Sequence, residues 1–368
     1  TLGTSNWILG NQLVSGFFPN KIPNPDLKWE RTGQFDIGLD LGLFNNRLRI
    51  TTDYYKKKTT DLLYSVAVPA TSGYQTMLKN IGSIENQGYE LSIESDNLTG
   101  AFSWTTAFNI AFNRNKVLEL GGEEYKEMAE GDGHLKTGSV RRLIVGEPIG
   151  VFYGYRFDGI FQNEEECKQQ TSSASPIGVG LRRYKDLNGD GKVDAANDRE
   201  ILGDANPKFF GGLTNTFAYK GFELNVFLQY SYGNKILNYN AMELENPTGG
   251  QNAYADMVNR WTPENPSNIY PKATTNRALL VSDRFIEDGS YLKLKTLSLS
   301  YSFPKINLKH IQGLRLYVTG QNLLTWTKYR GYDPEVSYRG ASTLEAGEDF
   351  GGYPQSRTFM FGIKLDIK

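Results

Sequence analysis

A run of acidic and amide side chains near the middle of the chain has the spacing of a calcium-binding loop. The segment reads Asp186-Leu-Asn-Gly-Asp-Gly-Lys-Val-Asp194-Ala-Ala-Asn-Asp198. The side chains at positions 1, 3, 5 and 9 of an EF-hand pattern are those of Asp186, Asn188, Asp190 and Asp194. Lys192 would offer its backbone carbonyl, and Gly191 stands at the sharp turn. Because Ca²⁺ prefers several hard oxygen ligands, the pattern predicts a structural calcium site.

The end of this loop departs from the pattern. Position 12 is Asn197, and the expected carboxylate arrives one residue later as Asp198. A bulge in the loop would return the Asp198 carboxylate to a ligating position. Without a bulge, the site lacks the bidentate carboxylate of position 12. The alternative is a metal-free turn, in which Asp and Asn side chains accept hydrogen bonds from their own backbone.

No group of residues has the spacing of an enzyme active site. His134 and His310 are the two histidines of the chain, and neither lies in a Ser/His/Asp or metal-binding pattern. Cys167 is the single cysteine, so no disulfide forms within the chain. Its acidic neighbours Glu164 to Glu166 raise the pKa of a thiol, which makes it unreactive. We therefore predict no catalytic residues and no enzymatic activity.

Aromatic side chains near the C-terminus are the candidates for ligand contact. They are Trp326, Tyr329, Tyr332, Tyr338 and Tyr353. Aromatic faces beside hydrogen-bonding groups such as Arg330, Asp333 and Arg339 suit the binding of a sugar or a peptide. The alternative is that these aromatic residues pack the loops on each other or on a partner that covers them.

These candidates lie in connections between segments of very regular alternation. From Arg357 to Lys368, apolar side chains alternate with polar or small ones, which places the two kinds on opposite faces of a strand. The other segments that alternate in this way are Gln34–Leu43, Arg47–Lys57, Gly88–Glu94, Phe102–Asn113, Phe222–Tyr232 and Tyr291–Phe303, and the pattern is weaker in Lys208–Tyr219 and Gly313–Asn322. Within Tyr291–Phe303 the phase changes, which predicts a β-bulge near Lys295 and Thr296.

The length of these strands favours a membrane barrel. A transmembrane β-strand needs about 9–11 residues, with apolar side chains facing lipid and aromatic residues near the strand ends. Aromatic residues make up 13% of this chain. The alternative is a soluble sandwich or barrel, whose strands average about five or six residues.

Composition excludes other classes of protein. The formal net charge of −1 gives no attraction to nucleic acid. The mean hydropathy is −0.47, and no apolar run approaches the roughly 18 residues of a spanning helix. A β-barrel remains compatible with this value, because every second residue of its strands faces a wet lumen.

Turn lengths predict how the strands cross. The short turns are Phe44–Asn46, Asn97–Ala101, Lys220–Gly221 and Pro304–Gln312. The long connections cover about Ser65–Asn86, Val117–Pro207, Leu237–Ser290 and Leu323–Ser356. Outer-membrane barrels have short periplasmic turns and long extracellular loops. Strict alternation of the two gives nine strands, and an odd number predicts part of a larger barrel whose earlier strands are absent.

Several stretches in a fixed order resemble one family. They are Asn24-Pro-Asp-Leu-Lys-Trp-Glu30, Gly146-Glu-Pro-Ile-Gly-Val-Phe-Tyr-Gly-Tyr155, Asp158-Gly-Ile-Phe-Gln162, Asp186-Leu-Asn-Gly-Asp-Gly191, Gly320-Gln-Asn-Leu-Leu-Thr325 and Gly331-Tyr-Asp-Pro-Glu335. This set resembles the C-terminal barrel part of SusC-like TonB-dependent outer-membrane transporters and covers nearly the whole chain. One departure is the last residue, Lys368, where family members usually end on an aromatic residue.

The resemblance implies a barrel of about 22 strands with a plugged lumen, of which nine are present here. It also implies a SusD-like surface lipoprotein over the extracellular mouth, and import of an oligosaccharide or a peptide driven through TonB. The plug, the TonB box and the signal peptide would lie upstream of this sequence.

We therefore expect an all-β, antiparallel transmembrane barrel segment in the outer membrane of a Gram-negative bacterium. Residues 1–368 would be the C-terminal portion of the barrel, with a long extracellular loop region at 117–207 that contains the acidic loop 186–198. The expected role is nutrient import. The alternatives are a soluble, calcium-stabilised all-β binding or adhesion module at the cell surface and, less well supported, a glycan-active enzyme.

Overall fold

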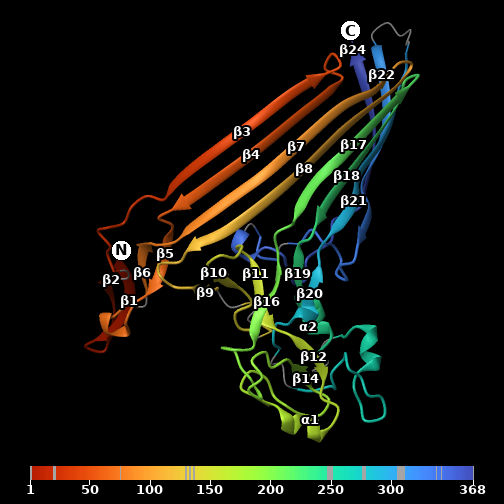
Figure 1. Ribbon diagram of the computed structural model, residues 1–368. Coiled ribbons are helices and arrows are strands. Elements are labelled where there is room, and N and C mark those ends of the chain that lie inside the picture. Colours follow the sequence, from red (N-terminus) through yellow and green to blue (C-terminus); the bar gives the residue numbers. More distant parts are fainter. Residues whose placement is uncertain are drawn as a thin grey trace.

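The main feature of the structure is one antiparallel sheet of nine strands that follow one another in chain order (Figure 1). The computed structural model describes residues 2–19, 22–74, 76–128, 131, 134–135, 137–246, 252–275, 279–304, 311–336, 338–340 and 342–367. The strands of the sheet are β3 (Arg31–Leu43), β4 (Leu48–Thr60), β7 (Ser83–Thr99), β8 (Phe102–Glu119), β17 (Phe209–Tyr219), β18 (Phe222–Tyr232), β21 (Tyr291–Ser302), β22 (Ile311–Thr327) and β24 (Thr358–Ile367). The predicted all-β class and the nine long strands are confirmed.

Some strands are longer than their alternation indicates. β7 was expected over Gly88–Glu94 but begins at Ser83 and ends at Thr99. Glu85 and Gln87 interrupt the apolar alternation, yet their backbones still pair with Lys116 and Arg114 of β8. Alternation of apolar and polar side chains predicts only the part of a strand that faces an apolar medium. Backbone hydrogen bonding to the neighbouring strand extends beyond that part.

The predicted β-bulge is present. Phe227 of β18 pairs with Thr296, and the next residue, Leu228, pairs with Leu294, so that Lys295 is the extra residue of β21. The insertion restores a common facing for the apolar residues on both sides of it.

The short turns and the long connections lie at opposite ends of the sheet (Figure 1). Between β3 and β4, the residues Phe44, Asn45 and Asn46 adopt φ angles of 56°, 59° and 62°. Between β17 and β18, Lys220 and Gly221 have φ angles of 46° and 87°, as a two-residue hairpin turn requires. The predicted turn at Pro304–Gln312 falls mostly on residues 305–310, which lie outside the described residues.

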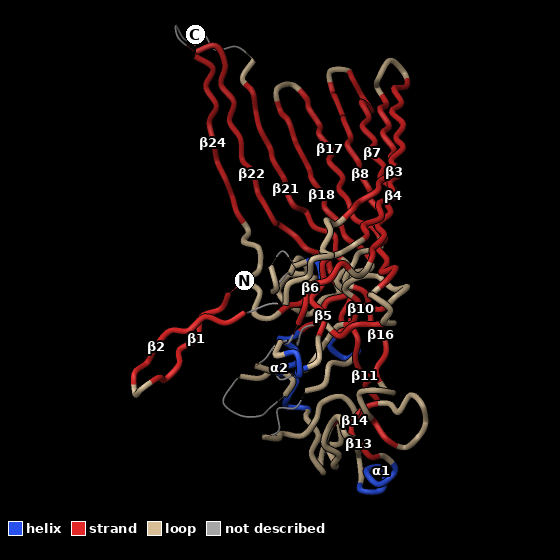
Figure 2. Tube along the Cα trace, turned by 90° about the vertical axis from the view of Figure 1, so that its left-hand side faces the viewer, coloured by secondary structure: helices blue, strands red, loops and turns tan. Residues whose placement is uncertain are grey.

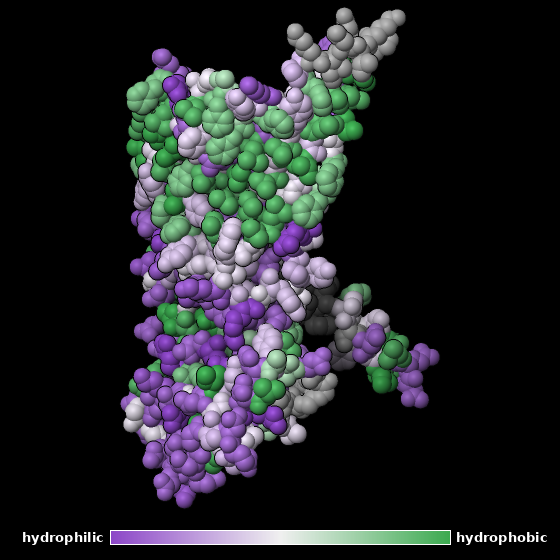
Figure 3. Space-filling model, turned by 90° about the vertical axis from the view of Figure 1, so that its right-hand side faces the viewer, coloured by the Kyte–Doolittle hydropathy of each residue, from purple (hydrophilic) through white to green (hydrophobic). Residues whose placement is uncertain are grey.

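One face of the sheet carries a continuous apolar surface, which appears as a broad hydrophobic band over the strands in Figure 3. The exposed fractions reach 60% at Phe35, 67% at Ile363 and 81% at Phe361. Other exposed apolar side chains on the long strands include Ile37, Leu39, Leu41, Trp104, Leu299, Leu316, Phe359, Leu365 and Ile367. An apolar surface of this extent is stable against lipid and costly against water.

The connections at the other end pack into a folded layer rather than separate loops. We call the described residues within 61–82, 120–208, 233–290 and 328–357 the loop layer. The hydrophobic core of the chain lies there, and its buried members are Leu135, Val140, Phe152, Ala205, Leu237, Tyr239, Ala241, Met242, Leu279, Val281 and Phe285. In Figure 3 the outer surface of this layer is mostly hydrophilic.

Short elements build the loop layer. Its strands are β5 (Leu63–Ala67), β6 (Thr76–Asn80), β9 (Tyr125–Glu127), β10 (Arg142–Ile144), β11 (Val151–Tyr155), β12 (Phe157–Ile160), β13 (Thr171–Ser172), β14 (Arg182–Tyr184), β15 (Lys192–Val193), β16 (Arg199–Asp204), β19 (Lys235–Asn238), β20 (Ile286–Asp288) and β23 (Glu348–Asp349). The helices are α1 (Glu164–Gln169) and α2 (Tyr239–Leu244), with 3₁₀ turns at Ala70–Ser72, Ala255–Asn259, Asp283–Phe285 and Thr343–Glu345.

The sheet has two edges. Within the described part of the chain, β3 and β24 stand at opposite ends of the strand order, so the nine strands form an open wall. A separate hairpin, β1 (Leu2–Leu9) with β2 (Gln12–Pro19), projects from the loop side of this wall (Figure 2). No helix among the described residues is long and apolar enough to span a membrane.

We predict that Ile363→Arg destabilises the protein and that Met360→Arg in the same strand does not. Ile363 lies on the apolar face near the middle of β24, where arginine facing lipid costs about 2–4 kcal/mol. Met360 lies on the opposite face, where a guanidinium keeps its water. The measurement is the free energy of unfolding by urea of the full-length protein in lipid vesicles. Equal losses for the two variants would contradict the assignment of the faces.

Candidate functional site

A buried lysine attaches the last connection of the loop layer to the polar face of the sheet. Lys293 stands on β21 beside Gln229 of β18 and is 1% exposed. Its ammonium donates to Asp333 Oδ1 at 2.6 Å and to Glu335 Oε2 at 2.5 Å. The bulge residue Lys295 adds a contact of 3.0 Å to the same Glu335 oxygen. The motif Gly331-Tyr-Asp-Pro-Glu335 therefore holds this connection against the wall.

Both carboxylates of this motif are stabilised as anions. Burial opposes the ionisation of Asp333, but hydrogen bonds from Lys293 and from the backbone N–H groups of Glu335 and Gln355 outweigh it and lower the pKa of that carboxyl. Burial also opposes the ionisation of Glu335, but hydrogen bonds from Lys293 and Lys295 outweigh it and lower the pKa of this carboxyl. Charge-assisted hydrogen bonds of this kind are roughly twice as strong as neutral ones.

A second group of charges joins three connections of the loop layer. Glu245, directly after α2, is fully buried. Its carboxylate accepts from Arg284 Nε at 2.9 Å and from Arg330 Nη1 at 2.8 Å. Arg330 also donates to Glu287 at 3.0 Å. From the connection 120–208, Arg182 donates to the backbone carbonyl of Glu245 at 3.0 Å.

A third buried pair lies next to β23. Arg141 is 2% exposed, and its Nε donates to Glu348 Oε1 at 2.9 Å. The same guanidinium donates to the carbonyl of Gly150 at 2.6 Å and lies 4.2 Å from the centre of the Phe152 ring. This pair joins residues that are 207 positions apart in the sequence.

These pairs resist rearrangement of any one connection alone. Removing one partner of a buried ion pair costs about 3–5 kcal/mol, because the other charge is left without compensation. The carboxylates of Asp333, Glu335, Glu245 and Glu348 all have cationic partners. The arrangement therefore suits a rigid rim above the sheet better than proton transfer in a reaction.

Two of the five aromatic residues proposed to contact a ligand, Trp326 and Tyr329, have structural surroundings. Trp326 is not a loop residue but the penultimate residue of β22, and it pairs with Leu292, which pairs with Tyr230. This row belongs to the apolar face, at a strand end where an interfacial aromatic belt is expected. Tyr329 is 5% exposed and donates to Asp349 Oδ2 at 2.5 Å, so it is a structural residue of the loop layer.

The other three candidates remain accessible. Tyr332 is 81% exposed and Tyr353 is 93% exposed. Tyr338 is less free, because its ring packs edge-on against Phe350 with centroids 5.6 Å apart and under the guanidinium of Arg339. Ligand contact at Tyr332, Tyr338 and Tyr353 stays a prediction.

The acidic loop is held by hydrogen bonds to its own backbone. Asp186 accepts from the N–H groups of Gly189 and Gly191, both at 2.7 Å. Asp194 accepts from two N–H groups at 3.0 Å, and hydrogen bonding from Lys192 lowers its pKa. Asn188 and Asp190 also accept from backbone N–H groups within the loop.

The displaced carboxylate closes the loop. Asp198 has no exposed surface and accepts from the N–H of Leu187 at 2.8 Å and from the N–H of Asp194 at 2.7 Å. Among the described residues, no three or more Asp, Glu, His or Cys side chains come together in an arrangement that could hold a metal ion. Because Asn188 and the Lys192 carbonyl would also be ligands, the calcium site stays a prediction.

The remaining residues considered for chemistry are in structural surroundings. His134 lies 3.6 Å from Glu243 and stacks on Phe350. Cys167 is half-buried on α1, and burial together with Glu164 and Glu166 raises the pKa of its thiol, as the sequence predicts. His310 lies outside the described residues.

Sequence reasoning missed the residues that hold the loop layer together. Lys293, Glu245 and Arg141 were not expected as important, because each meets its partner across a large distance in the sequence. One signal for Lys293 exists: it is a lysine on the polar face of an alternating strand, and Asp333 and Glu335 follow in a family motif.

Comparison with known proteins decides the family. A family model described as TonB dependent receptor-like, beta-barrel matches residues 3–323. The chain belongs to this family. TonB-dependent receptor P3 of Formosa agariphila is 40% identical over 97% of this chain, and the match covers 36% of that protein. TonB-dependent receptor SusC of Bacteroides thetaiotaomicron is 30% identical, over 94% of this chain and 33% of that protein.

Solved structures agree with the sequence relatives. The RagAB peptide transporter has a TM-score of 0.77 at 26% identity, covering 99% of this chain and 38% of that chain. The RagAB peptide importer in the 'open-open' state gives a TM-score of 0.78 at 25% identity. The chain therefore spans little more than a third of the length of these relatives.

The predicted resemblance is thus confirmed. The chain is the C-terminal barrel part of a SusC-like TonB-dependent receptor of the outer membrane of a Gram-negative bacterium. The family consists of receptors and transporters rather than enzymes.

We predict that Lys293→Met releases the last connection from the wall. The buried Asp333 and the half-buried Glu335 would lose their shared cation, and the loss of local stability is about 3 kcal/mol or more. Hydrogen–deuterium exchange of residues 331–336 in the full-length receptor measures this release. Lys295→Met is the matched control, because Lys295 is more exposed and contacts Glu335 alone; equal exchange in both variants would contradict the role given to Lys293.

A further prediction concerns the acidic loop in the presence of a chelator. Asp198→Ala leaves two backbone N–H groups without their acceptor and costs about 1–3 kcal/mol of local stability, whereas Asp190→Ala at an exposed position costs less. Hydrogen exchange of residues 186–198 is the measurement. The calcium hypothesis requires in addition a saturable gain of protection with Ca²⁺ that Asp190→Ala abolishes. Equal exchange in the two variants with chelator present would rule out Asp198 as the closing residue.

Proposed function

We propose that the receptor imports an oligosaccharide or a peptide, and that this chain supplies barrel wall and the rigid part of the extracellular mouth. The observation that carries the proposal is the charged attachment of the loop layer to the polar face of the sheet through Lys293, Asp333 and Glu335. A mouth that stays folded presents fixed groups to a ligand, which lowers the ordering cost of binding.

The accessible aromatic residues support this role. Tyr332 and Tyr353 expose most of their side chains at the loop end of the molecule. Aromatic faces with nearby polar groups bind sugars and peptides alike, so these residues leave the two ligand classes open. Energy coupling through TonB would belong to the upstream part of the receptor.

A surface lipoprotein partner of the SusD type is part of the proposal. The support is the relationship to SusC and to the RagAB peptide transporter. The lipoprotein would cover the loop layer, whose outer surface is mostly hydrophilic in Figure 3. A hydrophilic surface suits a contact that opens and closes more than a permanent apolar interface.

The soluble adhesion module is the weaker alternative. It would have to keep the apolar face of β3, β18 and β24 in water, and a patch of that size favours aggregation. The predicted calcium site in residues 186–198 is compatible with both functions. In our proposal it would stabilise a loop on the extracellular side.

The test uses the bacterium that carries the receptor. We expect loss of uptake of labelled oligosaccharide or oligopeptide on deletion of the receptor gene, and an equal loss on inactivation of TonB. We also expect the receptor, extracted from outer membrane in mild detergent without heating, to co-purify with a lipoprotein. Uptake that persists in both mutants for every ligand in an oligosaccharide and oligopeptide panel would overturn the proposal.

A further inference from the structure

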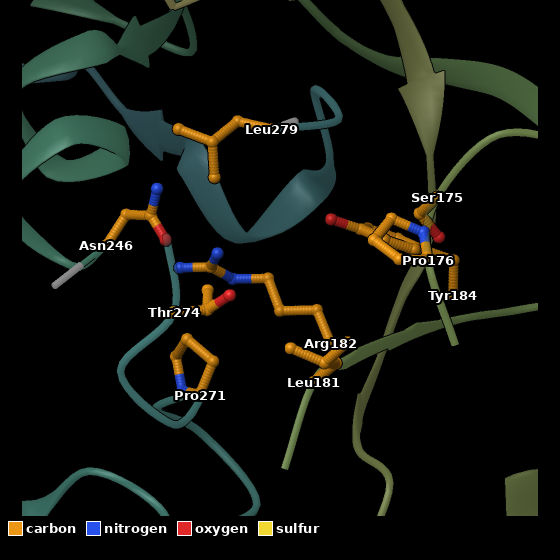
Figure 4. A pocket seen from close by; sticks show the side chains of 9 residues that line it. All are labelled: Ser175, Pro176, Leu181, Arg182, Tyr184, Asn246, Pro271, Thr274 and Leu279. Carbon is orange, nitrogen blue, oxygen red and sulfur yellow. The ribbon is translucent and has the colours of Figure 1, made fainter. Parts of the chain in front are cut away.

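Among the described residues that line a small pocket in the loop layer, one side chain is charged (Figure 4). Its lining residues are Ser175, Pro176, Leu181, Arg182, Tyr184, Asn246, Pro271, Thr274 and Leu279. The cavity volume is about 40 Å³. In the close view the Arg182 guanidinium extends into the pocket between Asn246 and Thr274. The described lining residues supply a cationic group and hydrogen-bonding groups but no carboxylate, so the pocket suits an anion.

The guanidinium of Arg182 is buried without a full set of acceptors. Arg182 is 8% exposed, and its Nη2 donates to the carbonyl of Glu245 at 3.0 Å. Its Nε is buried and has no hydrogen-bond partner in the described part of the chain. The Phe285 ring lies 5.5 Å away, which is a weak cation–π contact. A buried N–H without an acceptor is costly, and a charged one more so.

The carboxylates near Arg182 are already shared by other cations. Glu245 accepts from Arg284 and Arg330, and Arg330 also pairs with Glu287. Among these described residues, three guanidinium groups therefore face two carboxylates. One positive charge remains without a carboxylate of its own, and it lies at Arg182, beside the pocket.

We propose that the Arg182 pocket binds one carboxylate group of the ligand that the receptor imports. The planar guanidinium matches a carboxylate in shape, and its free Nε–H supplies a charge-assisted hydrogen bond. The Ser175 hydroxyl and the Asn246 amide line the same cavity and offer further donors. The assignment to the imported ligand rests on the proposed function, whereas anion binding by the pocket does not.

The size of the pocket limits what enters it. A cavity of about 40 Å³ admits a carboxylate but not a sugar ring or an amino-acid residue. The rest of the ligand would therefore lie outside, over the loop layer. Acidic peptides and sugars with uronic acid units both carry this group, and the receptor would select either over its neutral counterpart, because the neutral form leaves the Arg182 charge unpaired.

The first test measures anion binding directly, without transport. The full-length receptor in detergent is titrated with sodium acetate, and sodium chloride keeps the ionic strength constant. We expect acetate to raise the unfolding temperature of the wild-type receptor in a saturable way. The dissociation constant for acetate should rise about tenfold or more in Arg182→Met. Absence of an acetate effect in the wild-type receptor, or an equal effect in Arg182→Met, overturns the proposal.

Two further variants keep this test decisive. Arg183→Met is the matched control, because Arg183 is the next residue of β14 and already pairs with Asp158 at 2.9 Å; it should bind acetate like the wild-type receptor. Arg182→Lys keeps the charge but loses the planar fork and serves if Arg182→Met fails to fold. We expect weaker acetate binding in Arg182→Lys than in Arg183→Met, and the reverse order overturns the proposal.

The second test identifies the source of the carboxylate. A glutamate-containing oligopeptide is compared with its glutamine counterpart, and an oligogalacturonate with its methyl ester. Preference for one acidic form that disappears in Arg182→Met supports the assignment and names the ligand class. Equal binding of the acidic and neutral forms, unaffected by Arg182→Met, overturns the assignment to the ligand even where TonB-dependent uptake itself is observed.

Discussion

Backbone hydrogen bonding in lipid is the constraint on which the rest of this structure depends. Hydrocarbon offers no partner for a free N–H or C=O group, so a sheet that spans a membrane has to satisfy each of them within its own ladder. From β4 to β22 every long strand has a neighbour on both sides, whereas β3 and β24 have one neighbour each in the described residues. The wall therefore needs further strands at both edges to close.

The same constraint explains the two faces of the sheet. In a strand held by backbone hydrogen bonds, successive side chains point to opposite faces of the sheet. Apolar side chains therefore face the lipid, and polar side chains face the lumen. The bulge at Lys295 keeps this division where the alternation of β21 changes phase. It also places a second lysine beside Lys293, so a local adjustment of the wall supplies part of the charge that holds the last connection.

The loop layer obeys a different rule, because it has its own core and its own buried charges. Phe152, Leu237 and Phe285 are fully buried in that core, while Arg141 and Glu245 are buried beside opposite charges. Buried ion pairs contribute little net stability but are costly to break one partner at a time. They therefore keep the layer in one arrangement, which a binding surface requires. Arg182 is the member of this set whose charge is not fully matched.

Sequence patterns predicted the wall well and the loop layer poorly, for a physical reason. Alternation is a local property, so Phe359 to Ile367 and even the bulge near Lys295 could be predicted from neighbouring residues. The pairing of Lys293 with Asp333 and the burial of Tyr329 depend on contacts between distant segments. In the acidic loop, the spacing of Asp and Asn residues does not reveal that the Asp198 carboxylate faces two backbone N–H groups.

Labelling of single cysteines along β24 tests the central claim most directly. In a full-length receptor in which Cys167 and any further cysteine are replaced by serine, each position from 359 to 366 is changed to cysteine and exposed to a water-soluble maleimide in native outer membranes. We expect reaction at positions 360, 362, 364 and 366, which face the lumen, and protection at 359, 361, 363 and 365, which face lipid. Reaction at both sets of positions would contradict the account of this chain as a membrane-spanning wall.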